Sequence, residues 1–203
     1  MSLRIGVLAL QGDFAEHAAM IRRCGASAFE IRRSSEIADI ADINGLIIPG
    51  GESTAIDKLM TDNQDPIFDT ILSRGQSGMP IYGTCMGSIF LAKEIEGSKQ
   101  GRLALMDICV KRNAFGPQRF SFETSLDIPV LGPQAFPAVF IRGPIITSVS
   151  ADVEVLSSID EGIVMARQKN LLVTAFHPEI TDDLRVHQLF LSMVSAATAI
   201  GQK

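Results

Sequence analysis

One cysteine of the chain lies in a setting that suits a nucleophile. Cys85 stands between Gly83 and Gly87 in "GTCMG", after an apolar strand pattern and before a helical one. With serine at its centre, this glycine spacing is the sharp strand-to-helix turn that exposes a hydrolase nucleophile. Such a turn places the thiol at a helix N-terminus, which favours the thiolate, and aims the Met86 N–H at a developing oxyanion. The pentapeptide alone fits a buried structural cysteine equally well.

His177 is the best candidate for a base that would activate this thiol. It follows the apolar run "LLVTAF" and precedes Pro178, which disfavours a helix and favours extended backbone at His177. Alternate residues of an extended segment share a face, so Glu179 can accept a hydrogen bond from the ring and leave Nε2 for the thiol. A solvated turn is the alternative. The other histidines, His17 and His187, lie inside helical patterns, where packing is the simpler interpretation.

A third stretch, "LIIPGGEST" at residues 46–54, ends an apolar strand in two glycines. Consecutive glycines let backbone N–H groups turn toward a ligand or an oxyanion, while Ser53 can cap a following helix. A phosphate-binding loop is a weak rival, because the G-x-x-x-x-G-K-[ST] pattern is absent. A plain turn is the other alternative.

The elements that would position these residues alternate along the first half of the chain. Apolar, β-rich runs predict strands at 3–10, 28–32, 45–49, 80–84, 138–141, 153–156, 162–167 and 171–176. Helical periodicity predicts helices at 13–24, 53–60, 66–73, 85–95 and 182–200.

This alternation predicts an α/β fold: an open, mostly parallel, flavodoxin-like sheet flanked by helices, with an antiparallel extension from the strand-rich second half. We expect a single domain over residues 1–203. In such sheets the site lies at the carboxyl ends of the strands. Gln11, the Gly50–Ser53 loop, Cys85 and His177 all follow predicted strands.

Composition excludes several classes of protein. The net charge is −5 and no apolar run is long enough to span a membrane, so neither nucleic acid nor a membrane is expected as a partner. Three widely spaced cysteines without C-x-x-C indicate neither disulfides nor a metal site. With no secretory signal pattern at the N-terminus, a reducing cytoplasm is the expected location.

The order of these pieces resembles class I, triad-type glutamine amidotransferases: an oxyanion loop, a cysteine elbow, then His-x-Glu near the C-terminus. Further stretches narrow the resemblance to the glutaminase subunits of ribose-5-phosphate-dependent pyridoxal 5′-phosphate synthase. They are "GVLALQGDFAEH", "LIIPGGESTAI", "YGTCMGSIFLA", "RNAFGPQRFSFE", "FIRGP" and "AFHPEIT", which together span nearly the whole chain.

The resemblance implies hydrolysis of L-glutamine to glutamate and ammonia, without a cofactor or a metal. The ammonia would pass to a (βα)₈-barrel subunit that makes pyridoxal 5′-phosphate from ribose 5-phosphate and glyceraldehyde 3-phosphate, in an assembly of twelve copies of each subunit. The matching positions give a Cys85, His177 and Glu179 triad and an oxyanion hole from Gly51 and Met86. Glutamine-binding positions are Gly51, Glu52, Ser53, Arg112, Ile141 and Arg142, and Gln11 would contact the synthase.

The chain also departs from the family pattern. Met86 and Ser88 replace the usual Ala and Leu or Met, and a bulky side chain beside the thiol bears on the resting oxyanion hole. The other departures are Pro117, Arg119, Phe120 and Gly143.

Rival functions remain open on these residues. A glutaminase serving histidine or purine synthesis would keep the triad and change the partner, although the "ALQG" and "RNAFG" blocks speak against it. A non-catalytic binding subunit and an esterase or peptidase are the rivals from other classes. Because the glycine loop can rest in the wrong peptide orientation, we expect the free subunit to be nearly inactive without its partner.

Overall fold

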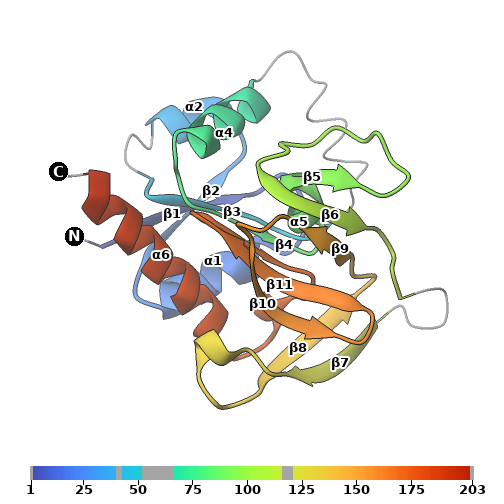
Figure 1. Ribbon diagram of the computed structural model, residues 1–203. Helices are drawn as coiled ribbons and strands as arrows, with labels where there is room; N and C mark the ends of the chain where they lie inside the picture. The colour runs from blue at the N-terminus through green and yellow to red at the C-terminus, as the bar shows by residue number, and fades with distance from the viewer. Residues whose placement is uncertain (1, 40–42, 52–65, 116–120, 202–203) are drawn as a thin grey trace.

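A curled mixed sheet forms the centre of the molecule (Figure 1). The computed structural model describes residues 2–39, 43–51, 66–115 and 121–201. Within these residues the sheet has ten strands. Along the sheet they run β2 (Ser27–Ile31), β1 (Arg4–Leu8), β3 (Gly45–Ile48), β4 (Ile81–Thr84), β12 (Leu171–Thr174), β11 (Gly162–Gln168), β9 (Ile145–Val149), β6 (Met106–Lys111) and β5 (Ala92–Ile95), with β10 (Glu154–Ile159) beside β11.

Strand direction divides the sheet into two parts. From β2 to β12 all neighbouring strands are parallel, whereas β11 is antiparallel to β12, β9 and β10. A separate antiparallel ribbon joins β7 (Ser121–Leu126) to β8 (Phe136–Ile141). The predicted fold class, a mostly parallel sheet with an antiparallel extension, is confirmed.

Helices cover both faces of the parallel part (Figure 1). One apolar cluster packs α4 (Ile67–Gln76) and α5 (Met86–Leu91) against the sheet, with α2 (Ser34–Asp39) beside α4. The other cluster packs α1 (Phe14–Arg23), α6 (Arg185–Gly201) and the β7–β8 ribbon against the opposite face. With both faces covered, the central strands β3, β4 and β12 are buried at every residue, which explains their continuous apolar runs.

The central register brings the predicted site together. Thr84, the last residue of β4, pairs with Thr174, the last residue of β12, and Ile48 of β3 pairs with Gly83. The segments that follow these three strands therefore leave the sheet at one edge, as expected for the carboxyl ends of parallel strands.

Some predicted elements differ in the structure. The helix expected at 85–95 ends at Leu91, and Ala92–Ile95 form β5 instead, because their backbone pairs in parallel with β6. Pairing between segments distant in sequence cannot be read from helical periodicity. Helix α2 was not predicted, and the helix expected at 53–60 lies outside the described residues.

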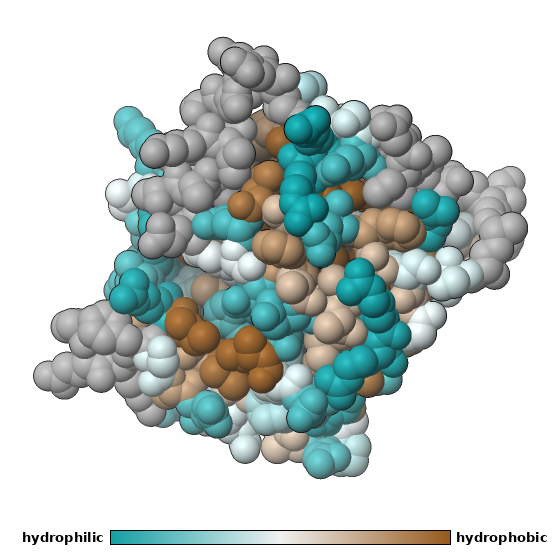
Figure 2. Space-filling model, turned by 180° about the vertical axis from the view of Figure 1, so that it is seen from behind, coloured by the Kyte–Doolittle hydropathy of each residue, from teal (hydrophilic) through white to brown (hydrophobic). Residues whose placement is uncertain are grey.

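The molecular surface has no single dominant apolar face in the view of Figure 2, where hydrophobic atoms form separate patches among hydrophilic ones. Among the described residues, the exposed large apolar side chains are Val130, Ile141, Val155 and Ile180. Within the same residues, no helix combines the length and the hydropathy needed to cross a bilayer.

Candidate active site

Cys85 occupies the sharp turn that its glycines predicted. It lies between β4 and α5 with φ 47° and ψ −106°, a conformation that a non-glycine residue rarely adopts. A methyl group on Gly87 would lie 2.0 Å from the Ile48 carbonyl oxygen, and one on Gly83 would lie 2.5 Å from the Gly87 carbonyl oxygen. Both glycines are therefore required by close backbone contacts, and the strain of about 1–3 kcal/mol at Cys85 is typical of a functional position.

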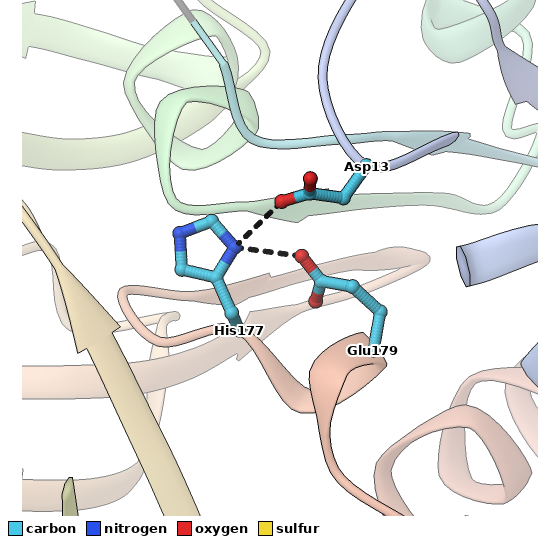
Figure 3. Close-up of side chains that lie close together, drawn as sticks. All are labelled: Asp13, His177 and Glu179. Carbon is cyan, nitrogen blue, oxygen red and sulfur yellow. Dashed lines mark hydrogen bonds and ion pairs between the residues drawn. The ribbon is translucent and has the colours of Figure 1, made fainter. Parts of the chain in front are cut away.

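His177 is held at the same edge by two carboxylates (Figure 3). Its Nδ1 is 2.7 Å from Oε1 of Glu179 and 3.5 Å from Oδ2 of Asp13. The ring and the Glu179 side chain are buried, whereas the Asp13 side chain is 41% exposed. The predicted contact between His177 and Glu179 is confirmed.

The local backbone at His177 differs from the extended segment that we predicted. Pro178–Ile180 form the 3₁₀ turn η2, with Pro178 in its first position. Proline is tolerated there because the first N–H of a helical turn has no intrahelical acceptor. The turn brings Glu179 back to His177, so the contact arises from a tight turn and not from alternation along a strand.

The environment of His177 favours its protonated form. Burial lowers the pKa of His177, but Cys85 and Glu179 outweigh burial and raise it to about 10. Cys85 raises the pKa of His177 by hydrogen bonding and, to a lesser extent, by Coulomb attraction. By strict hydrogen-bond geometry, Nε2 has no partner among the described residues, so this contact with Cys85 is a loose one. Burial raises the pKa of Glu179, and its hydrogen bond to His177 opposes that rise.

The thiol itself faces a backbone carbonyl. Cys85 Sγ is 3.8 Å from the carbonyl oxygen of Ile141, at the end of β8. A methyl group on Gly50 would lie 2.6 Å from His177 Cε1 and 3.3 Å from Cys85 Cβ. Gly50 therefore fits against both side chains, and any larger residue would push them apart.

The loop after β3 is tied to the end of β4. The Gly50 N–H donates to Thr84 Oγ1 at 3.0 Å. Gly51 has φ 148°, and a methyl group on it would lie 2.8 Å from Nε2 of Gln11. Gln11 thus packs directly on the predicted oxyanion loop. Glu52 and Ser53 lie outside the described residues, so their predicted glutamine contacts remain untested.

The two unusual residues after Cys85 have structural explanations. The Met86 side chain is buried in the apolar cluster beneath the sheet, so its bulk points into the core. The Ser88 hydroxyl is buried and donates to the Cys85 carbonyl oxygen at 2.6 Å. Both side chains support the turn from within.

The remaining predicted substrate-binding residues lie on two strand ends. Arg142 follows β8 with φ 48°, directly after the Ile141 carbonyl that the thiol faces. Arg112 follows β6, and its Nη1 donates to Gln100 Oε1 at 2.8 Å. Their roles toward glutamine stay predictions.

Only one group of metal-ligating side chains occurs among the described residues, namely Asp13, His177 and Glu179, whose donor atoms lie within 4.8 Å of one another. Both carboxylates, however, face the same nitrogen, and 2.7 Å between Nδ1 and Glu179 is a hydrogen-bond length. A bridging metal needs about 2 Å to each ligand. The geometry fits a histidine oriented by carboxylates.

Sequence reasoning missed three polar residues at this site. Asp13 begins the helix predicted at 13–24, and in the structure it is the N-cap residue of α1, yet its side chain makes no capping hydrogen bond and faces His177 instead. Thr84 reads as a strand residue and His17 as a packing histidine, although both are fully buried and contact each other at 3.0 Å. The only indication in the sequence that these three residues belong to the site is that they lie at or shortly after the ends of predicted strands.

Taken together, a strained thiol, a buried histidine with its carboxylate and a glycine loop beside both can perform acyl transfer through a covalent thioester. The thiolate would attack a carbonyl carbon, and the ring would carry the proton. This chemistry requires a substrate with an amide or ester group.

Comparison with known proteins agrees with this assignment. Two relatives named pyridoxal 5′-phosphate synthase subunit PdxT are similar over nearly their full length. The protein from Pelotomaculum thermopropionicum is 52% identical over 93% of this chain and 94% of its own. That from Desulforamulus reducens is 53% identical over 94% of this chain and 98% of its own.

Solved structures give the same result. A crystal structure described as a glutamine amidotransferase matches with a TM-score of 0.85 and 42% identity, over 94% of this chain and 98% of that chain. A putative GMP synthase component from Thermoplasma acidophilum, 18% identical with a TM-score of 0.74 over 100% of this chain and 99% of that one, shares the fold. A family model matches residues 7–196, and the chain therefore belongs to the SNO glutamine amidotransferase family.

Proposed function

We propose that this chain hydrolyses the side-chain amide of L-glutamine and supplies the ammonia to a synthase subunit that makes pyridoxal 5′-phosphate. The observation that carries the proposal is the placement of Cys85 on a strained turn beside the buried His177–Glu179 pair. Relatives at 52% and 53% identity are named as subunits of that synthase, which supports the same role here.

The proposed reaction uses each member of the site in turn. The Cys85 thiolate attacks the amide carbon, and backbone N–H groups of Gly51 and Met86 stabilise the oxyanion. Protonated His177 gives its Nε2 proton to the leaving ammonia and then takes a proton from water, which hydrolyses the thioester to glutamate. Glu179 orients the ring through Nδ1 and stabilises the imidazolium, as its 2.7 Å contact allows.

Recognition of glutamine is assigned to the rim of the site. Arg112 and Arg142 carry planar guanidinium groups that suit the α-carboxylate, and the loop with Gly51, Glu52 and Ser53 would bind the rest of the substrate. The Ile141 carbonyl oxygen, 3.8 Å from Cys85 Sγ, would accept a hydrogen bond from the substrate.

A partner surface around the site is part of the proposal. Gln11 packs on Gly51, so a synthase that contacts Gln11 can alter the oxyanion loop. Two exposed apolar side chains lie near the site: Ile141, 40% exposed, whose carbonyl oxygen faces the thiol, and Ile180, 42% exposed, which follows Glu179 in the chain. We infer a (βα)₈-barrel synthase as the partner, in an assembly of twelve copies of each subunit. Three free cysteines fit a cytoplasmic location.

The direct test measures glutamate release from glutamine by the wild type and by Cys85→Ala, each with and without a barrel synthase subunit. We expect activity only when both Cys85 and the partner are present. Activity that requires Cys85 but ignores the synthase would keep the chemistry and discard the role in pyridoxal 5′-phosphate synthesis. Equal rates for the wild type and Cys85→Ala would reject the nucleophile.

A further inference from the structure

Beneath the proposed triad lies a buried polar chain that the reaction itself does not use. His17 of α1, His187 of α6 and Thr84 of β4 are each 0% exposed. His17 Nδ1 is 3.0 Å from His187 Nε2, and His17 Nε2 is 3.0 Å from Thr84 Oγ1. Burying three polar side chains is costly unless they are hydrogen-bonded, so their arrangement calls for a physical account.

These hydrogen-bonded side chains contact two parts of the candidate site. Thr84 Oγ1 accepts the N–H of Gly50, which lies against Cys85 and His177. His17 Nε2 also lies 3.4 Å from Oε2 of Glu179, the carboxylate oxygen that does not face His177. One imidazole therefore contacts both the anchor of the oxyanion loop and the far side of the triad carboxylate.

The surroundings of His17 determine which of its nitrogens carries hydrogen. Burial, followed by the nearby His187 and His177, holds the pKa of His17 well below its usual range, and burial lowers the pKa of His187 to about 4, so both rings are neutral at pH 7. A lone pair at Nε2 would repel the Glu179 carboxylate, whereas an N–H there is attracted to it. Nε2 is therefore the protonated nitrogen.

The rest of the hydrogen-bond chain follows from that tautomer. His17 Nδ1 must accept from the Nε2–H of His187. Nδ1 of His187 is then a bare acceptor, and it has no partner among the described residues. Thr84 accepts two hydrogen bonds, one from His17 and one from Gly50, which matches its two lone pairs.

We propose that His17 is a positioning residue for glutamine hydrolysis. Its hydrogen bond to Thr84 fixes the oxyanion loop, and its Nε2–H stabilises the triad carboxylate electrostatically from 3.4 Å, without a hydrogen bond to Glu179 Oε2. The groups that face it are His187 from α6, Glu179 from η2, and Thr84 with the edge of the Tyr82 ring from β4. The inference rests on the proposed function. It assigns to His17 the positioning of the oxyanion loop and of Glu179, which neither the triad nor the predicted glutamine-binding residues provide.

The test compares two substitutions at this position in the complex with the synthase subunit. His17→Leu fills the space without a donor. We expect kcat to fall about ten- to a hundredfold, which is less than the loss of about 10²–10³-fold for an oxyanion donor itself, because His17 acts through Thr84, with KM changed less than about twofold. His17→Gln keeps an N–H near Nε2 and should recover most of kcat. Tyr82→Phe is the matched control: it removes a buried hydroxyl bonded to Thr174 in the same core and should leave kcat unchanged.

A second pair of variants tests the same hydrogen bonds at Thr84, and it is needed if His17→Leu does not fold. Thr84→Val removes the hydroxyl while keeping the shape, and Thr84→Ser keeps the hydroxyl. We expect Thr84→Val to lower kcat as His17→Leu does and Thr84→Ser to retain it. If His17→Leu does not fold, equal kcat values for Thr84→Val and Thr84→Ser would overturn the proposal. If His17→Leu folds, its loss and that of Thr84→Val should overlap in the double variant, because both act on Gly50. Fully additive losses, or equal kcat for His17→Leu and His17→Gln, would overturn the proposal.

Failure of the inference is distinguishable from failure of the proposed function. The wild-type rate and its dependence on Cys85 test the function, whereas the ratios among variants test His17. If the wild type releases no glutamate, the NMR titration of the His177 ring still reports on His17. His17→Leu removes an N–H that partly offsets the negative charge of Glu179, so the pKa of His177 should rise measurably. An unchanged titration would then overturn the inference.

Discussion

Replacing Glu179 by Gln tests the electrostatics of the site most directly. The structure raises the pKa of His177 from 6.5 to about 10, against the opposing effect of burial. That rise corresponds to about 5 kcal/mol, since one pKa unit is about 1.4 kcal/mol. Glutamine keeps an oxygen for Nδ1 but removes the carboxylate charge nearest to the imidazolium.

The expected magnitude follows from the distance of 2.7 Å between Nδ1 and Glu179 Oε1. An opposite charge this close shifts a pKa by about 1–3 units, so His177 of Glu179→Gln should titrate between about pH 7 and pH 9. The NH₂ group of the new amide would also face the His17 N–H, which disfavours the arrangement further. We expect kcat to fall about 10²–10⁴-fold, as for the loss of general acid–base catalysis.

Imidazole NMR of the ¹⁵N-labelled free protein makes the assay clean, because the chain has only three histidines. The pKa of His17 lies well below 6.5, that of His187 is about 4 and that of His177 is about 10, so the titration of His177 is well separated from those of the other two rings. Glu94→Gln, an exposed carboxylate on β5, serves as the control and should leave all three unchanged.

The same shift predicts a pH dependence of stability. The pKa of folded His177 lies above its value of 6.5 in the unfolded chain, so protonation stabilises the fold fully below about pH 6.5, and this contribution is lost as the pH rises toward about 10. The stability advantage of the wild type over Glu179→Gln should shrink across that window in urea unfolding. A wild-type His177 that titrates near pH 6.5, or one that Glu179→Gln does not move, would refute the electrostatic reasoning.

Three further changes test other parts of the structure. Gly50→Ala places a methyl group 2.6 Å from His177 Cε1 and should lower kcat at least about a hundredfold in the same glutamate-release assay. Gly97→Ala, the control, has no atom within 4 Å; its φ of 66° costs some stability, but kcat should stay unchanged. Asp13→Asn removes a half-exposed charge 3.5 Å from Nδ1 and should lower the pKa of His177 by less than Glu179→Gln does; an equal or larger shift in the NMR titration would contradict the assignment of Glu179 as the main partner. Phe190→Ala empties a fully buried site and should destabilise the fold by about 3–5 kcal/mol in urea unfolding, and a loss below about 1 kcal/mol would contradict its place in the core.

Much of the fold follows from local sequence alone. Strands such as Gly45–Ile48 and Ile81–Thr84 are buried on both faces, so their residues are mostly apolar and the strands are easily recognised. Helices with one apolar stripe, such as α1 and α6, also show their period directly. The segment Ala92–Ile95 was misassigned as helix, because only its pairing with a distant strand makes it β.

The sequence by itself determined the chemistry of the site: the glycines around Cys85, the His177–Glu179 pair and the order of the motifs, because close backbone contacts and short-range turns act over a few residues. Only the tertiary structure decided which other polar groups share that site. Asp13, His17 and Thr84 come from separate elements, and a parallel sheet covered by α1 and α6 brings them to one edge. Their local sequence fits an N-cap, a packing histidine and a strand residue, since hydrogen bonds between distant segments leave no periodic pattern in the chain.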